Sequence, residues 1–473
     1  MTETVRQGSR SYLFSIVLVA VISGLLFGYD TAVISGAEQA LDQFFRGAKD
    51  FIYTSWMHGF TASSALIGCV IGGAISGVLA SKLGRKWSLV VAACMLFISA
   101  VGSWCPESGI LPYGEPSRAL LVMFNFYRIL GGVGVGLASA VGPMYIAEIS
   151  PARIRGTMVS CNQFAIIFGM LVVYFINYII RNDLGTTSEA IQSAMVEIGW
   201  RRMFLSEAYP AGLFLILITL VPETPRLLVL KGNDGKAFSV LERINGTSEA
   251  EEILSEIKST VHERREKLLS YGLGVIVIGV LLSFFQQAIG INVVLYYAPR
   301  IFRSMGATGD VSMIQTVVMG IVNIIFTAVA IFTVDRIGRR PLLIIGSTGM
   351  LIGMSALSIL SFTDSIGIAA LVFIIIYTAS FMMSWGPICW VLISEIFPNT
   401  IRSQAVAIAV AAQWISNFLV SSTFPSLSGW SVGGTYAIYA AMSPLSALFV
   451  WKYVPETKGK SLEEMSALWK KNQ

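Results

Sequence analysis

The chain has 473 residues, of which 55% are hydrophobic and 13% are charged, and its mean hydropathy is +0.70. An ordinary soluble domain carries roughly 25% charged residues, so this composition excludes a soluble globular protein and indicates an integral membrane protein. The net charge of +5 arises largely in short segments between apolar runs, which argues against a nucleic-acid partner. Five cysteines without a CxxC pair and two histidines without a shared motif predict no metal, haem or other cofactor.

Long apolar runs recur along the whole chain, and a membrane-spanning helix needs about 20 mostly apolar residues. We predict twelve such helices, so the expected fold is an all-α membrane protein. The expected spans are 12–36, 57–80, 86–105, 118–144, 156–181, 202–221, 271–297, 311–334, 341–362, 367–393, 403–424 and 432–453. The first run is too long for a signal-peptide core and no small-residue cleavage motif follows it, so we expect no cleavable signal.

Basic clusters follow several even-numbered spans, for example in segments 82–86 and 336–340, and basic residues mark both ends of the chain. The positive-inside rule places these loops and both termini in the cytoplasm. The opposite loops also contain cations, but these are more scattered. We therefore expect a multi-pass protein with the lipid bilayer as one of its partners.

Asp30 lies inside the first expected span. A carboxylate at membrane depth costs roughly 2.5–3.5 kcal/mol on insertion scales, so such residues are rare and usually functional. Arg128 in span 4 is its natural partner, because an unpaired buried guanidinium is also costly. Glu207 in span 6 is a third ionisable group that could tune the pair. If the pair separates during a conformational change, Asp30 can take a proton, so we predict a proton-coupling site; the alternative is a static ion pair.

Segment 131–136, with the sequence GGVGVG, looks like a nucleotide-binding loop but lies within span 4 and follows no strand. We predict close helix packing there instead, and the same for the glycines of span 2. Those glycines are Gly68, Gly72, Gly73 and Gly77. No Walker A sequence occurs, so ATP is not the expected energy source.

The longest polar stretch, 223–270, divides six spans from six and is dense in both charge signs. Apolar residues at helical spacing favour short surface helices at 235–244 and 248–267; the alternative is a flexible linker. We therefore divide the chain into an N-terminal six-helix half (1–222), a cytoplasmic helical linker (223–270) and a C-terminal half with its tail (271–473).

The two halves repeat three charged motifs in the same order. Gly84-Arg85-Lys86 matches Gly338-Arg339-Arg340, segment 148–155 (EISPARIR) matches 395–402 (EIFPNTIR), and the Pro-Glu-Thr at 222–224 matches that at 455–457. This repeat predicts two parallel six-helix halves with a binding site at their interface near the membrane midplane, an architecture typical of transporters.

Arginines and glutamates in these loops predict a cytoplasmic latch that closes one face and breaks when the halves rock. The expected members are Arg85, Glu148 and Arg155 in the first half, and Asp335, Arg339, Glu395 and Arg402 in the second. The alternative is that the arginines only set the topology. That rule does not require the repeated glutamate, which favours the latch.

Neutral amides and tryptophans gather in the spans. An amide both donates and accepts hydrogen bonds without a buried charge, which suits the hydroxyls of a sugar, and an aromatic wall suits its apolar ring faces. Gln286 and Gln287 are adjacent in span 7, Gly290 follows, and a broken helix beside a central cavity is the expected result. The alternative use of such amides is to bridge membrane helices, at roughly 0.6 kcal/mol each.

Taken together, the motifs resemble the sugar porter family of the major facilitator superfamily along nearly the whole chain. The resemblance rests on the repeated motifs above, on Pro222-Glu223-Thr224-Pro225-Arg226 and on segment 286–292 (QQAIGIN). Within the family, segments 26–30 (LFGYD) and 162–169 (NQFAIIFG) look most like those of the bacterial proton-coupled xylose porters.

The resemblance implies particular roles for residues of this chain. The family's sugar ligands fall on Gln163, Gln286, Gln287, Asn292, Trp390 and Gln413, and residues lining the pocket on Phe27, Tyr296, Asn323, Gly386 and Trp414. Met170 is a departure, because the xylose porters look to have a glutamine there, and this bears on the sugar preference. Proton-coupled members carry aspartate at the place of Asp30, whereas passive carriers tend to carry asparagine.

We therefore expect a proton-coupled importer of a monosaccharide, with D-xylose as the expected substrate, in a bacterial inner membrane. Its partners would be the sugar, protons and lipid. The alternatives are a passive sugar facilitator and a sugar-binding membrane sensor. An enzyme is not expected, because the sequence contains no recognisable nucleophile or metal cluster.

Overall fold

The computed structural model describes residues 8–151, 154–260, 268–304, 309–363, 368–398, 401–458 and Trp469. Within these ranges the chain forms helices and no sheet. The N-terminal half contains α1 (Arg10–Arg46), α2 (Ser55–Lys82), α3 (Arg85–Trp104), α4 (Arg118–Ile149), α5 (Arg155–Asp183), α6 (Ser188–Ala194), the π-helical turn η2 (Met195–Gly199), α7 (Trp200–Ser206) and α8 (Ala208–Leu220).

The linker and the second half are also helical. The linker contains α9 (Pro225–Leu230), α10 (Asp234–Asn245), α11 (Thr247–Thr260) and the short η3 (Leu268–Tyr271). The C-terminal half contains α12 (Leu273–Ala288), α13 (Ile291–Ser304), α14 (Gly309–Ile337), α15 (Arg339–Phe362), α16 (Ile368–Met382), α17 (Trp385–Glu395), α18 (Arg402–Trp430) and α19 (Val432–Tyr453).

The predicted spans agree with these helices. Eleven helical stretches in the described part of the chain are long and apolar enough to cross a membrane. The twelfth expected span, 432–453, falls on α19, which is helical but carries glycines, serines and tyrosines that lower its apolar character. The expected all-α fold is therefore confirmed.

The expected linker helices are present as α10 and α11. Residues 261–267, the end of the second expected helix, lie outside the described residues. Sequence reasoning missed α9, whose six residues begin at Pro225, the favoured residue for a first helical turn. The backbone N–H of Ser9 donates to the carbonyl of Arg243 at 2.9 Å, which ties the start of α1 to the linker.

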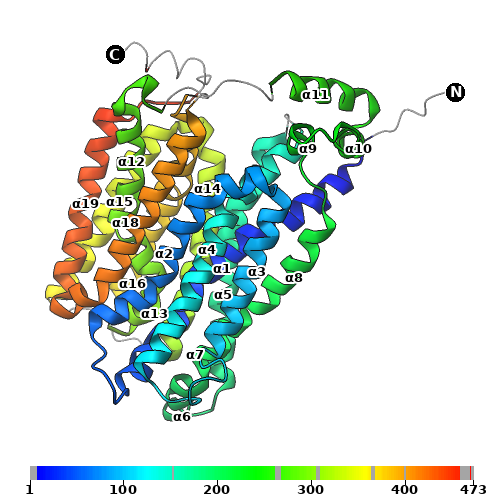
Figure 1. Cartoon of the computed structure of the whole chain (residues 1–473). Helices are drawn as coiled ribbons and strands as arrows, with labels where there is room; N and C mark the ends of the chain where they lie inside the picture. The colour runs from blue at the N-terminus through cyan, green and yellow to red at the C-terminus, as the bar shows by residue number, and fades with distance from the viewer. Residues whose placement is uncertain are drawn as a thin grey trace.

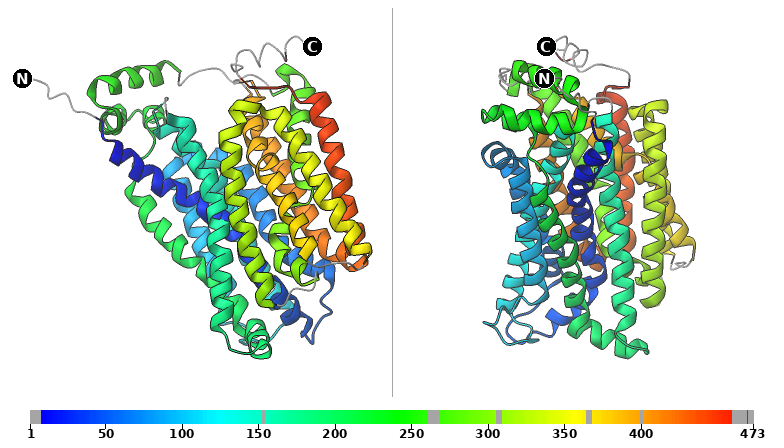
Figure 2. Two further views of the ribbon diagram at one scale, coloured as in Figure 1. Left: turned by 180° about the vertical axis from the view of Figure 1, so that it is seen from behind. Right: turned by 90° about the vertical axis from the view of Figure 1, so that its right-hand side faces the viewer.

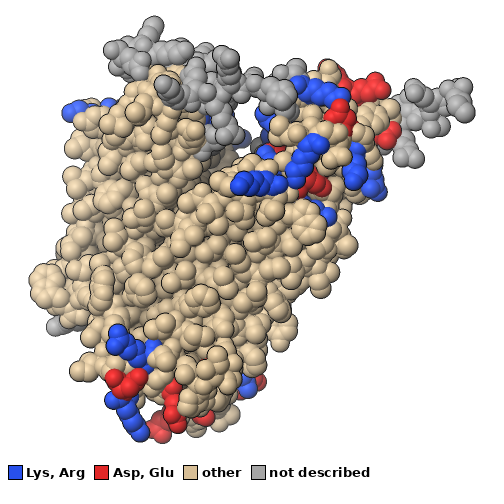
Figure 3. Space-filling model, in the orientation of Figure 1, with Lys and Arg blue, Asp and Glu red and all other residues tan. Residues whose placement is uncertain are grey.

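Two helix bundles lie side by side, and the linker helices α9, α10 and α11 lie at one end of the molecule, beside the N-terminal bundle (Figure 1). The start of α1 and the end of α19 lie at that same end, as two further views show (Figure 2). The halves pack against each other chiefly through α2 with α18 and α5 with α14. Charged side chains gather at the two ends of the visible face, with a broad uncharged band between them (Figure 3). Such a band suits the hydrocarbon core of a bilayer.

Close packing of α2 and α4 explains part of the glycine pattern. A Cβ on Gly68 would lie 2.0 Å from the carbonyl oxygen of Ile129, and one on Gly132 would lie 1.8 Å from that of Ala65. The helices can approach this closely only because glycine has no side chain. An added Cβ would meet nothing within 4 Å at Gly73 or Gly77. The backbone of Gly73 nevertheless packs closely against Gly136, so the expectation of close packing is wrong only for Gly77.

Three of the long apolar stretches are interrupted. α12 ends at Ala288 and α13 begins at Ile291, with Gly290 between them at φ +86°, so the predicted break in this span is confirmed. The α7–α8 stretch is interrupted at Glu207, and α16 and α17 are separated at Ser384. These breaks free backbone groups at membrane depth, a feature that transporters use beside central cavities.

Candidate substrate cavity and ion-pair sites

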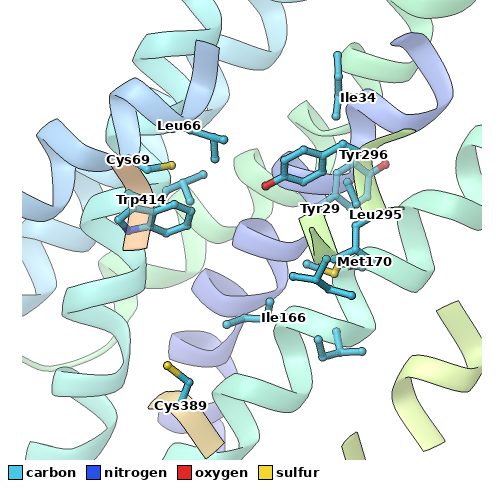
Figure 4. Packing of buried hydrophobic residues seen from close by; sticks show 14 of the residues in the cluster. Tyr29, Ile34, Leu66, Cys69, Ile166, Met170, Leu295, Tyr296, Cys389 and Trp414 are labelled. Atoms are coloured by element: carbon cyan, nitrogen blue, oxygen red, sulfur yellow. The ribbon is translucent and has the colours of Figure 1, made fainter. Parts of the chain in front are cut away.

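A cavity of about 90 Å³ lies between the two halves. Helices α1 and α5 supply its wall from the first half, and α12, α13, α14, α16, α17 and α18 supply it from the second. Figure 4 shows side chains of both halves meeting in this region, with Met170 of α5 near Leu295 of α13. The cavity therefore has the place that the two-half plan predicts for a substrate.

Most of the predicted pocket residues line this cavity. They are Phe27, Gln163, Gln286, Gln287, Asn292, Tyr296, Gly386, Trp390, Gln413 and Trp414. Met170, the position at which the chain departs from the xylose porters, lines it too. Asn323 is the exception: it is buried on α14, but it is not among the residues that line the cavity.

The break at Gly290 brings amides from both sides of it together. Gln287 at the end of α12 donates to the side-chain oxygen of Gln286 at 3.1 Å and accepts a hydrogen bond from Asn292 at the start of α13. In a regular helix, neighbours such as Gln286 and Gln287 would point about 100° apart. The non-helical turn at Gly290 changes the direction in which the following side chains point, so that three amides form one chain of hydrogen bonds.

Gln286 is the centre of this network. Its amide nitrogen donates to the carbonyl oxygens of Trp385 and Gly386 at 3.0 and 3.2 Å, and its oxygen also accepts from Gln413. The carbonyls that it binds belong to the start of α17, just after the interruption at Ser384. One glutamine thus joins α12, α17 and α18 around the cavity.

Two buried polar atoms at the cavity have no hydrogen-bond partner in the described part of the chain. They are the side-chain oxygen of Gln413 and the indole nitrogen of Trp414. A free acceptor and a free donor among the lining residues suit the hydroxyl groups of a polyol, each of which can both donate and accept. The ring of Phe27 lies 5.4 Å from that of Trp414, so an aromatic surface adjoins these polar atoms. A small polyol ring would find both of its preferred surfaces here.

The structure adds lining residues that sequence reasoning missed. Thr31 and Thr327 contribute hydroxyl groups to the wall, and Phe381 and Pro387 contribute apolar surface. The sequence does contain a signal for Thr31: it lies four residues after Phe27 in a helix and therefore shares the face of that predicted pocket residue. Asn417, one turn after Gln413, also lines the cavity and donates to the hydroxyl of Tyr296 at 3.2 Å.

Asp30 and Arg128 form an ion pair, as the sequence predicts. Nη1 of Arg128 donates to Oδ1 of Asp30 at 2.6 Å, and both side chains are at most 2% exposed. Nη2 also donates to the backbone oxygen of Asp30 at 3.3 Å, and the guanidinium lies 5.1 Å from the centre of the Phe204 ring. The pair joins α1 to α4 within the N-terminal half.

Glu207 lies close enough to this pair to interact electrostatically with both partners. It is fully buried at the interruption between α7 and α8, and neither of its carboxyl oxygens has a hydrogen-bond partner in the described structure. Two carboxyl groups thus face one guanidinium. An uncompensated buried charge is very unfavourable, so Glu207 bears directly on the charge balance around this pair.

At the end of the molecule that carries the linker, Arg85 pairs with Glu148 through Nη2 at 2.8 Å. The hydroxyl of Thr224 donates to the other oxygen of Glu148 at 2.7 Å. Glu223 accepts hydrogen bonds from the backbone N–H groups of Arg85 and Lys86, at 3.1 and 3.2 Å. The first Pro-Glu-Thr motif therefore completes the site that the other two motifs begin, which sequence reasoning did not predict.

The second half repeats this arrangement group by group. Arg339 pairs with Glu395 at 2.9 Å, and the hydroxyl of Thr457 donates to Glu395 at 2.5 Å. Glu456 accepts from the backbone N–H groups of Arg339 and Arg340, at 3.1 and 2.9 Å. Burial alone would raise the pKa of Glu456, but hydrogen bonds from four backbone N–H groups outweigh it and hold that pKa below its ordinary value.

The predicted latch needs correction in its geometry. Each pair joins elements of one half, so Arg85–Glu148 and Arg339–Glu395 do not bridge the two halves. Arg155 is exposed, and no ion pair joins it to Glu148 in the described structure. Arg402 donates to the carbonyl of Phe397 at 3.3 Å, and the side chain of Asp335 lies outside the described residues. These pairs brace each half internally.

Among the residues that the structure describes, no three His, Cys, Asp or Glu side chains gather in a way that could hold a metal ion.

Comparisons with known proteins place the chain in a family. The family model described as "Sugar (and other) transporter" matches residues 16–469. The D-xylose-proton symporter of Escherichia coli (strain K12) is 50% identical over 481 residues, covering 98% of this chain and 97% of that protein. The glucose facilitated diffusion protein of Zymomonas mobilis (strain ATCC 31821 / ZM4 / CP4) is 36% identical, covering 98% of this chain and 99% of that protein.

A solved structure agrees with these relatives. The inward open conformation of the xylose transporter XylE from E. coli matches with a TM-score of 0.86 and 49% sequence identity, covering 97% of this chain and 100% of that chain. The chain therefore belongs to the sugar transporter family of the major facilitator superfamily.

Proposed function

We propose that this protein imports a monosaccharide together with a proton by alternating access, with D-xylose as the expected substrate. It would act in a bacterial inner membrane, with the linker and both termini in the cytoplasm. The observation that carries the proposal is the position of α1. This one helix supplies Phe27 and Thr31 to the cavity and, between them, Asp30 to the buried ion pair.

The cavity supports a sugar as the substrate. Its wall combines amides, threonine hydroxyls and aromatic rings, and the described residues that line it include no charged side chain. A neutral polyol binds such a wall without an uncompensated charge, whereas a charged metabolite would need a counter-ion there. The name of the 50% identical relative, a D-xylose-proton symporter, supports a pentose as the first sugar to test.

The buried pair supports coupling to protons. Separation of Asp30 from Arg128 during the transport cycle would let the carboxylate take a proton, and Glu207 offers a second carboxyl group at the same place. One proton that moves through 100 mV supplies roughly 2.3 kcal/mol. This would support about a 40-fold sugar gradient, because 1.4 kcal/mol corresponds to a factor of ten.

The distribution of basic residues supports the proposed orientation. Lys82, Arg85, Lys86, Arg339 and Arg340 all lie at the turns between long helices at the end that carries the linker. The positive-inside rule assigns such short basic loops to the cytoplasm.

A passive facilitator is the second candidate, because a relative that is 36% identical carries the name of a facilitated diffusion protein. The deciding experiment measures sugar-driven proton uptake into proteoliposomes, for the native chain and for Asp30→Asn. Symport predicts that xylose drives proton entry in the native protein, and that Asp30→Asn abolishes it while sugar exchange persists. Sugar flux without proton movement in either protein would refute coupling and leave the facilitator.

A further inference from the structure

A second ionisable cluster, with Glu38 and His58 buried and Arg300 partly exposed, lies at the end opposite the linker, where the two halves meet. Arg300 of α13 donates from Nη1 to Oε1 of Glu38 on α1, at 2.7 Å. One turn further along α13, Arg303 binds the side-chain oxygen of Gln39. Because α1 belongs to the first half and α13 to the second, these contacts join the halves at this end.

Glu38 has a second partner in its own half. Nε2 of His58, near the start of α2, lies 2.7 Å from the same carboxyl oxygen, and both side chains are 2% exposed. A carboxylate can only accept hydrogen bonds, so Nε2 carries a proton whether the imidazole is neutral or charged. Since α1 and α2 belong to one half, this bond does not have to break when the halves separate.

We propose that Glu38 and Arg300 form the gate that closes the periplasmic end of the transporter, and that His58 holds Glu38 when this gate opens. The inference rests on the proposed transport function and orientation. Opening this end carries Arg300 away from Glu38, because the two residues lie on different halves. A buried carboxylate without a partner is strongly disfavoured, so a partner that remains in place makes opening easier.

Glu38 and Arg300 would act on the transport cycle from outside the sugar cavity. Neither Glu38 nor Arg300 lines the candidate sugar cavity, and both instead line a separate polar cavity of about 260 Å³. The pairs at the linker end, in contrast, lie within single halves. The described structure therefore has charge-assisted bridges between the halves at the periplasmic end, which fits a state that is closed on that side.

The charges around His58 determine whether its protonation favours the open or the closed state of the gate. The groups that face His58 and its partner are Glu38, Asp42, Arg46, Tyr53, Tyr297 and Arg300. In the closed state, a protonated His58 and Arg300 would place two positive charges on one carboxyl oxygen. Once Arg300 has left, the imidazolium becomes the counter-charge of Glu38.

Protonation of His58 is therefore more favourable in the open state than in the closed state. By linkage, acid then favours opening of the periplasmic end. Asp42 leaves this sign unchanged, because its carboxylate lies 3.8 Å from Nδ1 of His58 and stabilises the charged ring in either state. The gradient that drives symport makes the outer side the more acidic one, so the gate would open toward the side on which sugar and protons are loaded.

The test measures opening directly, by double electron–electron resonance between spin labels on the two halves. Glu115→Cys and Gly429→Cys place labels at exposed positions at this end, in a chain whose five native cysteines are replaced by serine. All samples carry Asp30→Asn, so that titration of Asp30 does not contribute. The protein is free of sugar, so the readout does not depend on whether the chain transports a sugar or a proton.

We expect Arg300→Gln to raise the ratio of open to closed molecules at least tenfold, and Glu38→Gln to act in the same direction. Arg300→Lys, which keeps the charge, should remain mostly closed. The matched control is Arg202→Gln, which removes an exposed arginine paired with Asp183 within one half, and it should change nothing. Equal distance distributions for Arg300→Gln and this control would overturn the gate.

The role of His58 has its own readout. Lowering the pH from about 8 to about 5.5 should raise the open fraction at least threefold with His58 present, because a protonated imidazole favours the open state. His58→Gln keeps a hydrogen-bond donor toward Glu38 but cannot take up a proton, so its open fraction should stay constant. A response of the same size in His58→Gln would overturn the role assigned to His58.

Discussion

The contact between α1 and α5 offers a sharp test of the described geometry, because Gly28 allows the two helices to touch. A Cβ added at Gly28 would lie 1.8 Å from the carbonyl oxygen of Ile166, and an ordinary contact of this kind is at least 3.4 Å. In Gly28→Ala the two helices must therefore move apart locally by about 1.6 Å. Overpacking of this kind costs about 1–3 kcal/mol, and occasionally more.

The displacement should also reach the functional sites. Phe27 and Thr31 of α1 and Ile166 of α5 line the cavity, and Asp30 lies two residues after Gly28. We expect sugar affinity to fall by about tenfold, which corresponds to about 1.4 kcal/mol of the strain appearing at the binding site. The assays are thermal unfolding of the purified protein and an equilibrium binding titration with xylose.

Gly73→Ala on α2 is the matched control, because an added Cβ there meets nothing within 4 Å. Both changes replace a helical glycine by alanine, so the gain in helix propensity cancels and the difference isolates the steric term. If Gly28→Ala unfolds at the same temperature as Gly73→Ala and binds sugar equally well, the close approach of α1 and α5 at this point is refuted.

Three further predictions concern single side chains. Gln286→Leu should weaken sugar binding at least tenfold in a titration, because it breaks the network and leaves the carbonyl of Trp385 without its donor; binding within twofold of native would contradict this. Met170→Gln, which adds an amide to the cavity wall, should change the ratio of xylose to glucose affinity at least threefold, whereas Met170→Leu should leave it within twofold. Glu456→Gln should lower thermal stability at pH 7; because the folded-state pKa is lowered, this deficit should persist above an unfolded pKa of about 4.3 and shrink as the pH falls below it. A deficit that is constant with pH would contradict that account.

Much of this protein could be predicted from its sequence, because a membrane constrains local composition. The hydrocarbon core demands long apolar helices and makes every charged residue within them conspicuous. The helices, the interrupted span at Gly290 and the pairing of Asp30 with Arg128 all follow from this. The amides of the cavity were identifiable for the same reason, since neutral polar side chains are rare in such helices.

The tertiary structure decided which groups meet across long distances in the chain. It joined each Pro-Glu-Thr motif to an arginine–glutamate pair within the same half, where sequence reasoning had expected contacts that close one face. It placed Asn323 outside the cavity wall and Thr31 and Thr327 within it, because helix rotation is not fixed by composition. It also brought Glu38, His58 and Arg300 together from three helices. These residues share no local motif, and only the packing of the two halves makes them one cluster.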